Sequence, residues 1–407
     1  MTENIVPPKS TVTLSSVEGD LEVGRRAVVK GEGSPPTVAV SGTVYIEGDC
    51  VFDCNLSAEN LDGEDDVTIK GELEVRNRVK IEDGRLVVSG DMKAKRVEID
   101  KSLRVEGDFK FDDVDIGGRL EVKGTTTGGR IDVGGAFDAN GEVKTESIDV
   151  GGSVRIRSKV DVRDIDVGGT MEIEGGRVGR VDIGGSFVSK GSLEFDEINV
   201  GGTVKLAGGC TGGDIDVGGS FKVEGDLKFR NIDVGGVVAI SASAKGDDLD
   251  VGGKLKVGGG LHLSGKLDVG GVAEVRGELV AGRIEVGGKL YAGKANADST
   301  VCVGGSIETV EGVQASYVRI GRRGRVEGPI RADEALISKR ARVEDVYAKD
   351  ITLERDVRAR NLYGERIRLE SGCQVTGEVR YTASLEAAPG VTFAKTPQKV
   401  DELPLDT

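Results

Sequence analysis

One five-residue phrase recurs twelve times between Val114 and Gly305: an apolar residue, a usually acidic residue, a second apolar residue and two glycines. The first glycine of each copy falls at 117, 134, 151, 168, 184, 201, 218, 235, 252, 270, 287 and 304. The repeat is therefore 17 residues long, with one step of 16 and one of 18. A period this short and constant indicates structural repeats that stack on one another.

Each phrase is followed by further triplets that alternate apolar and polar residues, such as Leu120-Glu121-Val122 and Leu193-Glu194-Phe195. Alternation with period 2 indicates β-strands. Strands this short cannot pair within one repeat, so each pairs with its equivalent in the next repeat. The sequence therefore predicts an all-β fold, a single-chain parallel β-solenoid with about 17 residues and three short strands per turn. The first and third residues of each triplet point inward, and the middle residue faces solvent.

The glycines argue against helices and for tight corners. A chain with 64 glycines in 407 residues leaves no helical face, because each glycine costs about 1 kcal/mol in a helix interior. The paired glycines suit corners that need either a positive φ or a close approach of the backbone between turns.

The pattern divides the chain into five parts. We expect residues 1–10 to be a disordered tail, 11–113 irregular solenoid turns, and 114–305 the regular Gly-Gly solenoid. Strand spacing continues without glycine pairs through 306–393, and 394–407 is expected to be a second disordered tail.

Composition restricts the function classes. A net charge of −15 argues against nucleic acid as a partner. No apolar run approaches the roughly 18 residues of a membrane span, so we expect no integral membrane segment. The opening MTENIVPPKS lacks the pattern of a secretion signal, which predicts a cytoplasmic protein. Five scattered cysteines indicate neither a disulfide framework nor a metal site: Cys50, Cys54, Cys210, Cys302 and Cys373.

Candidate chemistry is sparse. The only histidine, His262, lies between two inward leucines and should point to solvent. The acids of the repeated phrase should form a ladder along one face: Asp115, Asp132, Asp149, Asp166, Asp182, Asp216, Asp233, Asp250, Asp268 and Glu285. Paired carboxylates suit acid-base catalysis or cation binding, but repetition of the structural unit explains a feature found in nearly every turn. No nucleotide-binding or nucleophile motif is present. We therefore predict no enzyme, no catalytic residue, no cofactor and no metal ligand.

Residues 318–393 carry a family resemblance. The units VEGPIRA, RLESGCQVTGEVRY and LEAAPGVTF resemble the repeated and closing phrases of bactofilins, polymer-forming cytoskeletal proteins of bacteria. The resemblance implies a right-handed triangular β-helix that assembles end to end without nucleotide. It favours a structural scaffold subunit as the function. One alternative is a monomeric rod that acts as a spacer or protein-binding platform, and another is a solenoid carbohydrate-active enzyme.

The expected partner is the protein itself, joined through the solenoid ends, with other proteins possible along the faces. Residues 11–66 contain 12 acids and 3 bases, whereas residues 315–385 contain 15 bases and 11 acids. This asymmetry predicts head-to-tail joining. The candidate polymerisation interface comprises Val12, Leu14, Arg322, Arg323, Arg325, Val391 and Phe393.

Overall fold

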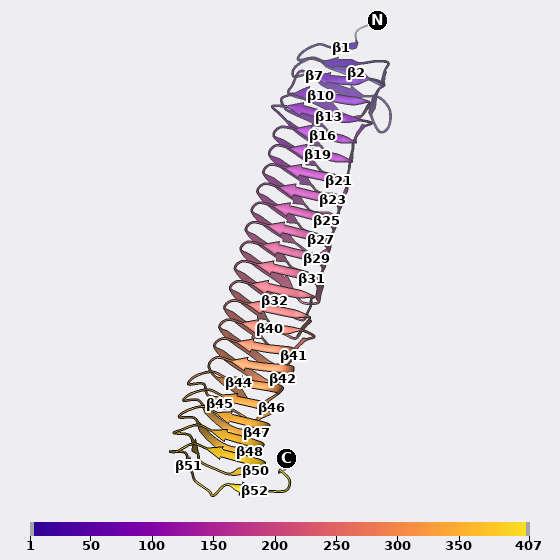
Figure 1. Ribbon diagram of the computed structural model, residues 1–407. Coiled ribbons are helices and arrows are strands. Elements are labelled where there is room, and N and C mark those ends of the chain that lie inside the picture. The colour runs from indigo at the N-terminus through magenta and orange to yellow at the C-terminus, as the bar shows by residue number, and fades with distance from the viewer. Residues whose placement is uncertain (1–3, 404–407) are drawn as a thin grey trace. The chain divides into compact units, whose positions relative to one another are not determined.

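A computed structural model describes residues 4–403, which form 52 strands joined by turns and contain no helix. The chain divides into two compact units, Met1–Leu206 (unit 1) and Ala207–Thr407 (unit 2). In each unit the strands pair in parallel with their equivalents one turn away, and Figure 1 shows them stacked within each unit. The predicted parallel β-solenoid is confirmed. Each turn has three sides, here called faces A, B and C, and face A carries the repeated phrase.

Unit 1 contains β1 to β29 and all of β30 except its last residue, Ala207. Face A begins with β1 (Asn4–Val6), β4 (Leu21–Val23), β7 (Thr43–Ile46), β10 (Asn60–Glu64), β13 (Arg78–Glu82), β16 (Arg96–Ile99) and β19 (Asp113–Ile116). Face B contains β2 (Thr11–Leu14), β5 (Val28–Gly31), β8 (Cys50–Asp53), β11 (Val67–Ile69), β14 (Arg85–Val88), β17 (Ser102–Val105), β20 (Arg119–Val122), β22 (Ala136–Ala139), β24 (Ser153–Ile156), β26 (Thr170–Ile173), β28 (Ser186–Ser189) and β30 (Thr203–Ala207). Face C begins with β3 (Ser16–Val17), β6 (Thr37–Val40), β9 (Asn55–Ala58), β12 (Leu73–Val75), β15 (Met92–Lys93) and β18 (Phe109–Lys110). Longer strands then cross from face C to face A: β21 (Thr126–Val133), β23 (Val143–Val150), β25 (Val160–Val167), β27 (Gly176–Ile183) and β29 (Leu193–Val200).

Unit 2 contains β31 to β52. Face A alone holds β34 (Asn231–Val234), β37 (Asp248–Val251) and β40 (Lys266–Val269). Face B holds β32 (Ser220–Glu224), β35 (Val237–Ile240), β38 (Lys254–Val257), β43 (Ile307–Thr309), β45 (Val326–Glu327), β49 (Gln374–Val375) and β51 (Thr392–Phe393), and face C holds β33 (Leu227–Lys228), β36 (Ala244–Gly246), β39 (Leu261–Leu263) and β52 (Gln398–Lys399). Strands that cross from face C to face A are β31 (Cys210–Val217), β44 (Val313–Ile320), β46 (Ile330–Ile337) and β50 (Val379–Ala387). Strands that run over all three faces are β41 (Val272–Val286), β42 (Lys289–Val303), β47 (Arg342–Leu353) and β48 (Arg358–Leu369).

The core is a narrow column of stacked apolar side chains. On face A, Ile131 pairs with Ile148 and Ile148 with Ile165, a step of 17 residues. On face B, Phe137 pairs with Val154 in the same register. These five side chains are at most 2% exposed. Outward residues between them reach solvent, so the predicted facing of the triplets is confirmed.

The glycine pairs are needed because successive turns approach closely at the corner between faces A and B. A Cβ atom on Gly151 would lie 2.5 Å from the carbonyl oxygen of Gly134, and one on Gly152 would lie 2.3 Å from that of Gly135. Neither glycine of this pair has a positive φ. Close approach, and not a left-handed backbone, therefore explains these pairs.

Left-handed corners occur elsewhere, both at glycines and at other residues. Arg26 and Asp49 in unit 1 have φ of 62° and 53°, and Arg323 and Arg340 in unit 2 have 61° and 62°. These corners close with a backbone bond such as that from the Ala27 N–H to the Gly24 carbonyl, 3.2 Å. At the corner between faces A and B, the regular part of the repeat thus differs from its flanks in backbone geometry, while the strand stacking is the same.

Parts of both terminal segments that were expected to be disordered form strands in the structure. Asn4–Val6 form β1, which pairs with β4, and Gln398–Lys399 form β52, which pairs with β50. Backbone bonding to a neighbouring turn is enough to order these segments, although their sequences lack the repeated phrase. Residues 1–3 and 404–407 of the expected tails lie outside the described residues.

Candidate functional site

The first turn of unit 1 presents an open strand edge. In residues 4–403, β1, β2 and β3 pair only with β4, β5 and β6 of the following turn. Val12 and Leu14 are inward residues of β2 and are only half-buried, whereas Val29, the partner of Val12, is completely buried. An edge of this kind has free backbone groups beside exposed apolar surface, which favours pairing with another chain.

Within residues 4–403, the last turn of unit 2 is open in the same way, since β51 and β52 pair only with β49 and β50. Phe393 of β51 pairs with Val375 and is half-buried, whereas Val375 is 2% exposed. Val391 and Leu385 are also half-buried at this edge. The structure therefore brings Val391 and Phe393 together at the terminal turn, as predicted.

The three predicted arginines lie elsewhere. Arg322 and Arg323 occupy the corner after β44, and Arg325 precedes β45. Four further turns, containing β46, β47, β48 and β50, stack in order beyond β44. These arginines therefore line the side of unit 2 and are not at its end. The spacing of charges in the sequence did not reveal this because the solenoid continues for four turns after them.

The predicted acidic ladder exists in each unit, at outward positions of face A. In unit 1, Asp132 pairs with Asp149 and Asp149 with Asp166, and the row continues to Asp115 on one side and Asp182 on the other. In unit 2 a second row is formed by Asp216, Asp233, Asp250, Asp268 and Glu285. Each carboxylate therefore stands one turn from another of the same charge.

This arrangement disfavours ionisation. Burial, followed by the neighbouring Asp132 and Glu98 carboxylates, raises the pKa of Asp115. Burial and the charges of Asp149 and Asp182 raise the pKa of Asp166 in the same direction.

Basic residues two positions earlier neutralise part of each row. Arg130 bonds to Asp132 at 2.6 Å, and Lys266 bonds to Asp268 at 2.5 Å. Within residues 4–403, Asp149, Asp166, Asp216, Asp233 and Asp250 make no ion pair. The rows thus keep free negative charge.

The cysteines and the histidine lie where the alternation predicts. Cys50, Cys54, Cys210 and Cys373 are buried, and none of the five cysteines forms a disulfide within residues 4–403. Cys302 is half-exposed and occupies the ladder row of unit 2, between Glu285 and Arg319. His262 is exposed between two buried leucines. In the described part of the chain, no group of three or more His, Cys, Asp or Glu side chains is placed to hold a metal ion.

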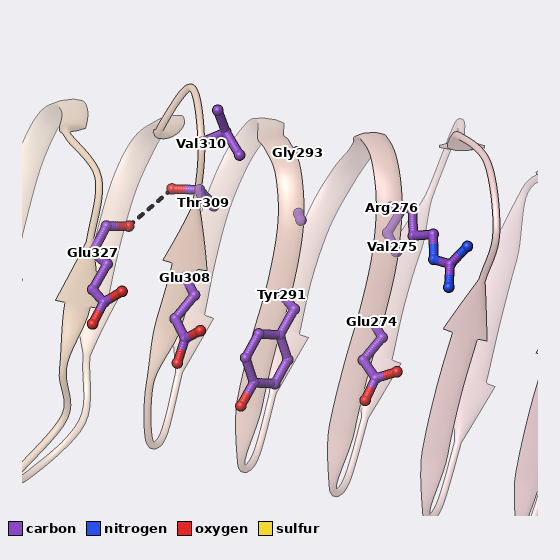
Figure 2. Close-up of a pocket in the computed structure, with 10 residues that line it drawn as sticks. Glu274, Val275, Arg276, Tyr291, Gly293, Glu308, Thr309, Val310 and Glu327 are labelled. Carbon is purple, nitrogen blue, oxygen red and sulfur yellow. Dashed lines mark hydrogen bonds between the residues drawn. The ribbon is translucent and has the colours of Figure 1, made fainter.

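A shallow hollow of about 590 Å³ on face B of unit 2 was not predicted. Glu274, Tyr291, Glu308 and Glu327 come from successive turns and extend in the same direction (Figure 2). Val310, on the corner beside them, is 85% exposed. The signal in the sequence was weak, since one tyrosine among outward charged residues marks no motif.

The charges around the hollow are unevenly compensated. Lys254 bonds to Glu274 at 2.6 Å, and Arg325 bonds to Glu327 at 2.8 Å. Glu308 makes no ion pair in residues 4–403. An aromatic ring flanked by carboxylates can hold a cationic group through its face and through ion pairing.

Comparison with known proteins identifies no relative: no family model, no curated protein and no solved structure matches the chain. Residues 4–403 also contain no helix with the length and apolar character required to cross a membrane.

Proposed function

We propose that this chain is a structural protein, a scaffold subunit that assembles end to end without nucleotide. The observation that supports the proposal is the pair of open edges, one on the first turn of unit 1 and one on the last turn of unit 2. In both, inward residues such as Leu14 and Phe393 are half-exposed, although their equivalents in the next turn inside are buried or are glycine.

Parallel strand edges explain how assembly would proceed. An unpaired edge offers a row of N–H and C=O groups, and a second edge satisfies them while covering the apolar side chains. This contact needs no hydrolysis, and the sequence carries no phosphate-binding motif. The resemblance of residues 318–393 to bactofilins supports the same cytoskeletal role.

Electron microscopy of negatively stained protein, without ATP or GTP, tests the proposal. We expect filaments from the native chain and their loss in Phe393→Asp and Leu14→Asp, since a charge would enter the apolar contact. Thr392→Asp and Thr13→Asp add the same charge at the adjacent exposed positions and should still form filaments. Dispersed particles at every concentration, or filaments unaffected by all four substitutions, would refute end-to-end assembly.

A second candidate function is a binding platform, and the hollow beside Tyr291 favours it. A peptide rich in arginine or lysine would place a cation against the ring and near the Glu308 carboxylate. Calorimetric titration with hexa-arginine should detect binding that Tyr291→Ala weakens about tenfold. Val237→Ala, at an exposed position of face B whose neighbours in the adjacent turns are Ser220 and Lys254, should have no effect. Hydrolysis of a polysaccharide that stops on Glu308→Gln would instead favour a carbohydrate-active enzyme.

A further inference from the structure

The charge of the outward side chains on face A of unit 2 changes from negative to positive along the solenoid. The outward row runs through Asp233, Asp250, Asp268 and Glu285, reaches Cys302, and then continues to Arg319. Beyond Arg319 the row contains Leu336, Thr352 and Arg368 in successive turns. The acidic half and the basic half therefore meet at Cys302.

The corner next to this row reinforces the change of sign. On the acidic half the corner consists of glycine pairs without side chains, such as Gly252–Gly253 and Gly270–Gly271. On the basic half the same corner carries Arg322, Arg323, Lys339, Arg340 and Arg355. One half is thus flat and negative, and the other projects long cationic side chains.

This charge is only partly compensated. On the acidic half Lys266 pairs with Asp268 and Glu285, and Arg283 pairs with Glu285, whereas Asp233 and Asp250 make no ion pair within residues 4–403. In residues 4–403 there is no ion pair to Arg319, Arg322, Arg323 or Lys339. Acids near the basic half are already engaged: Asp356 lies 3.5 Å from Arg340, and the Glu354 carboxylate accepts the Lys339 N–H at 3.0 Å.

The two halves are complementary about Cys302. Glu285 is one turn before Cys302 and Arg319 is one turn after it, while Asp233 is four turns before and Arg368 four turns after. A two-fold axis parallel to the strands at Cys302 would exchange these positions between two copies. Each acidic half would then face the other copy's basic half, which is an isologous contact.

We propose that two copies of this chain pair side by side and antiparallel through face A of unit 2, about a two-fold axis at Cys302. The long side chains of Arg322 and Arg323 lie over the flat glycine corner and reach Glu285 and Asp268 of the second copy. This contact lies on the side of the solenoid, so it is independent of the end-to-end assembly proposed above.

Parallel pairing of the same faces is disfavoured. It would place Asp250 opposite Asp250 and Arg319 opposite Arg319 in the outward row, and like charges in contact cost free energy. The antiparallel pair removes this repulsion and also relieves the repulsion within the acidic row.

The contact should be modest in strength. Nine turns are separated by eight spacings of about 4.8 Å each and therefore span roughly 38 Å. A strip of this length, as wide as one strand and its corner, buries on the order of 1,000 Å² over both copies, which is the low end for specific interfaces. Charge supplies most of the attraction, so association should weaken as salt rises above about 0.1 M.

Cross-linking through Cys302 can be used to detect the proposed pairing. It is the half-exposed cysteine, it has a small side chain, and it borders a hollow of about 350 Å³ that also includes Glu285 and Arg319. On the axis it faces the Cys302 of the second copy. Diamide, an oxidant that accepts two electrons and two protons from a thiol pair, should convert these thiols to an intermolecular disulfide.

The test is diamide cross-linking of the full chain, read on non-reducing gels and by peptide mass spectrometry. At low salt we expect a Cys302–Cys302 dimer, absent in Cys302→Ser and reduced at least about tenfold in R322E/R323E or in D268K/E285K. Mixing these two variants should restore cross-linking between unlike copies, because each reversed half then faces its complement.

R322Q/R323Q removes the two positive charges without reversing them and should give an intermediate yield of the Cys302–Cys302 dimer. This variant is the control for misfolding of the charge-reversed forms. No Cys302 dimer at low salt, or a yield that charge reversal leaves unchanged, would overturn the lateral pairing. Filaments that persist in R322E/R323E would leave end-to-end assembly intact while the lateral contact is lost.

Discussion

A Cβ atom at position 134 would lie 2.3 Å from the carbonyl oxygen of Gly117, one turn away. The same relationship links Gly151 to Gly134 and Gly168 to Gly151, at 2.5 and 2.4 Å. Since the backbone bond from the Gly134 N–H to the Ile116 carbonyl, 2.9 Å, fixes the separation of these turns, a side chain cannot be admitted without breaking the stack.

Gly152→Ala should therefore destabilise unit 1 by about 2 kcal/mol, because the added Cβ would lie 2.3 Å from the carbonyl oxygen of Gly135. Ser153→Ala, at the next and exposed position, should change the free energy of unfolding by less than about 0.5 kcal/mol. Urea unfolding of both variants measures the difference. Equal midpoints would show that the turns can move apart at the corner.

Leu255 and Lys256 are adjacent on β38, but Leu255 is completely buried and Lys256 is exposed. Leu255→Asp should cost at least about 4 kcal/mol because an unpaired carboxylate enters an apolar column. Lys256→Asp introduces the same group one position along and should cost less than about 1 kcal/mol. Thermal unfolding followed by circular dichroism compares them, and similar losses would mean that the assigned facing is incorrect.

Asp250 and Asp350 are aspartates of face A in unit 2 with opposite surroundings. Burial and the Asp268 and Asp233 charges raise the pKa of Asp250, whereas a hydrogen bond from Arg366 lowers the pKa of Asp350. At pH 7, Asp250→Asn should stabilise the fold by roughly 0.5 kcal/mol, because it removes repulsion between neighbouring strands. Asp350→Asn should destabilise it.

The effect of each substitution depends on pH with a defined sign. Because the pKa of Asp250 is raised in the folded state, the ionised carboxylate destabilises the fold and the protonated carboxyl does not. The gain in stability from Asp250→Asn should therefore vanish below the ordinary aspartate pKa of about 4. The loss from Asp350→Asn should shrink as the pH falls through the lowered pKa of Asp350. Melting temperatures at pH 7 and near pH 3 check both, and a pH-independent gain for Asp250→Asn would contradict the electrostatic cause.

Tyr347 and Tyr363 stack on face C of unit 2, with ring centroids 4.8 Å apart and planes inclined by 14°. Tyr363 is 9% exposed, so Tyr363→Ala should cost about 3 kcal/mol through lost burial and stacking. Tyr363→Phe keeps the ring and should stay within about 0.5 kcal/mol of the native free energy. Chemical denaturation distinguishes them, and a large loss in the phenylalanine variant would place the energy in the hydroxyl group.

How much of this could be predicted depends on the range of the interactions involved. The alternation in Ile131-Asp132-Val133 predicts strand facing, and its return after 17 residues predicts which residues pair, because both follow from local geometry and a constant period. The acidic rows follow from the same register. The left-handed backbone at Arg323 and Arg340 could not be predicted, since arginine does not favour that conformation and only the corner requires it.

The positions of residues along the solenoid could also be determined only from the structure. Charge alone suggested that Arg322, Arg323 and Arg325 lie at a joining end, yet the turns after β44 place them on the side. The hollow beside Tyr291 is formed by Glu274, Tyr291 and Glu308, which belong to three successive turns and which no contiguous motif joins.

By itself the sequence determined the fold class, the facing of the strands and the pairing register, because a short repeat makes every turn pair with a copy of itself. Only the tertiary structure decided which glycines are compressed between turns, which apolar residues are left uncovered at the edges, and where acidic and basic rows meet at Cys302. These features depend on distances between turns and on where the stacking stops, and neither quantity is contained in a repeat unit.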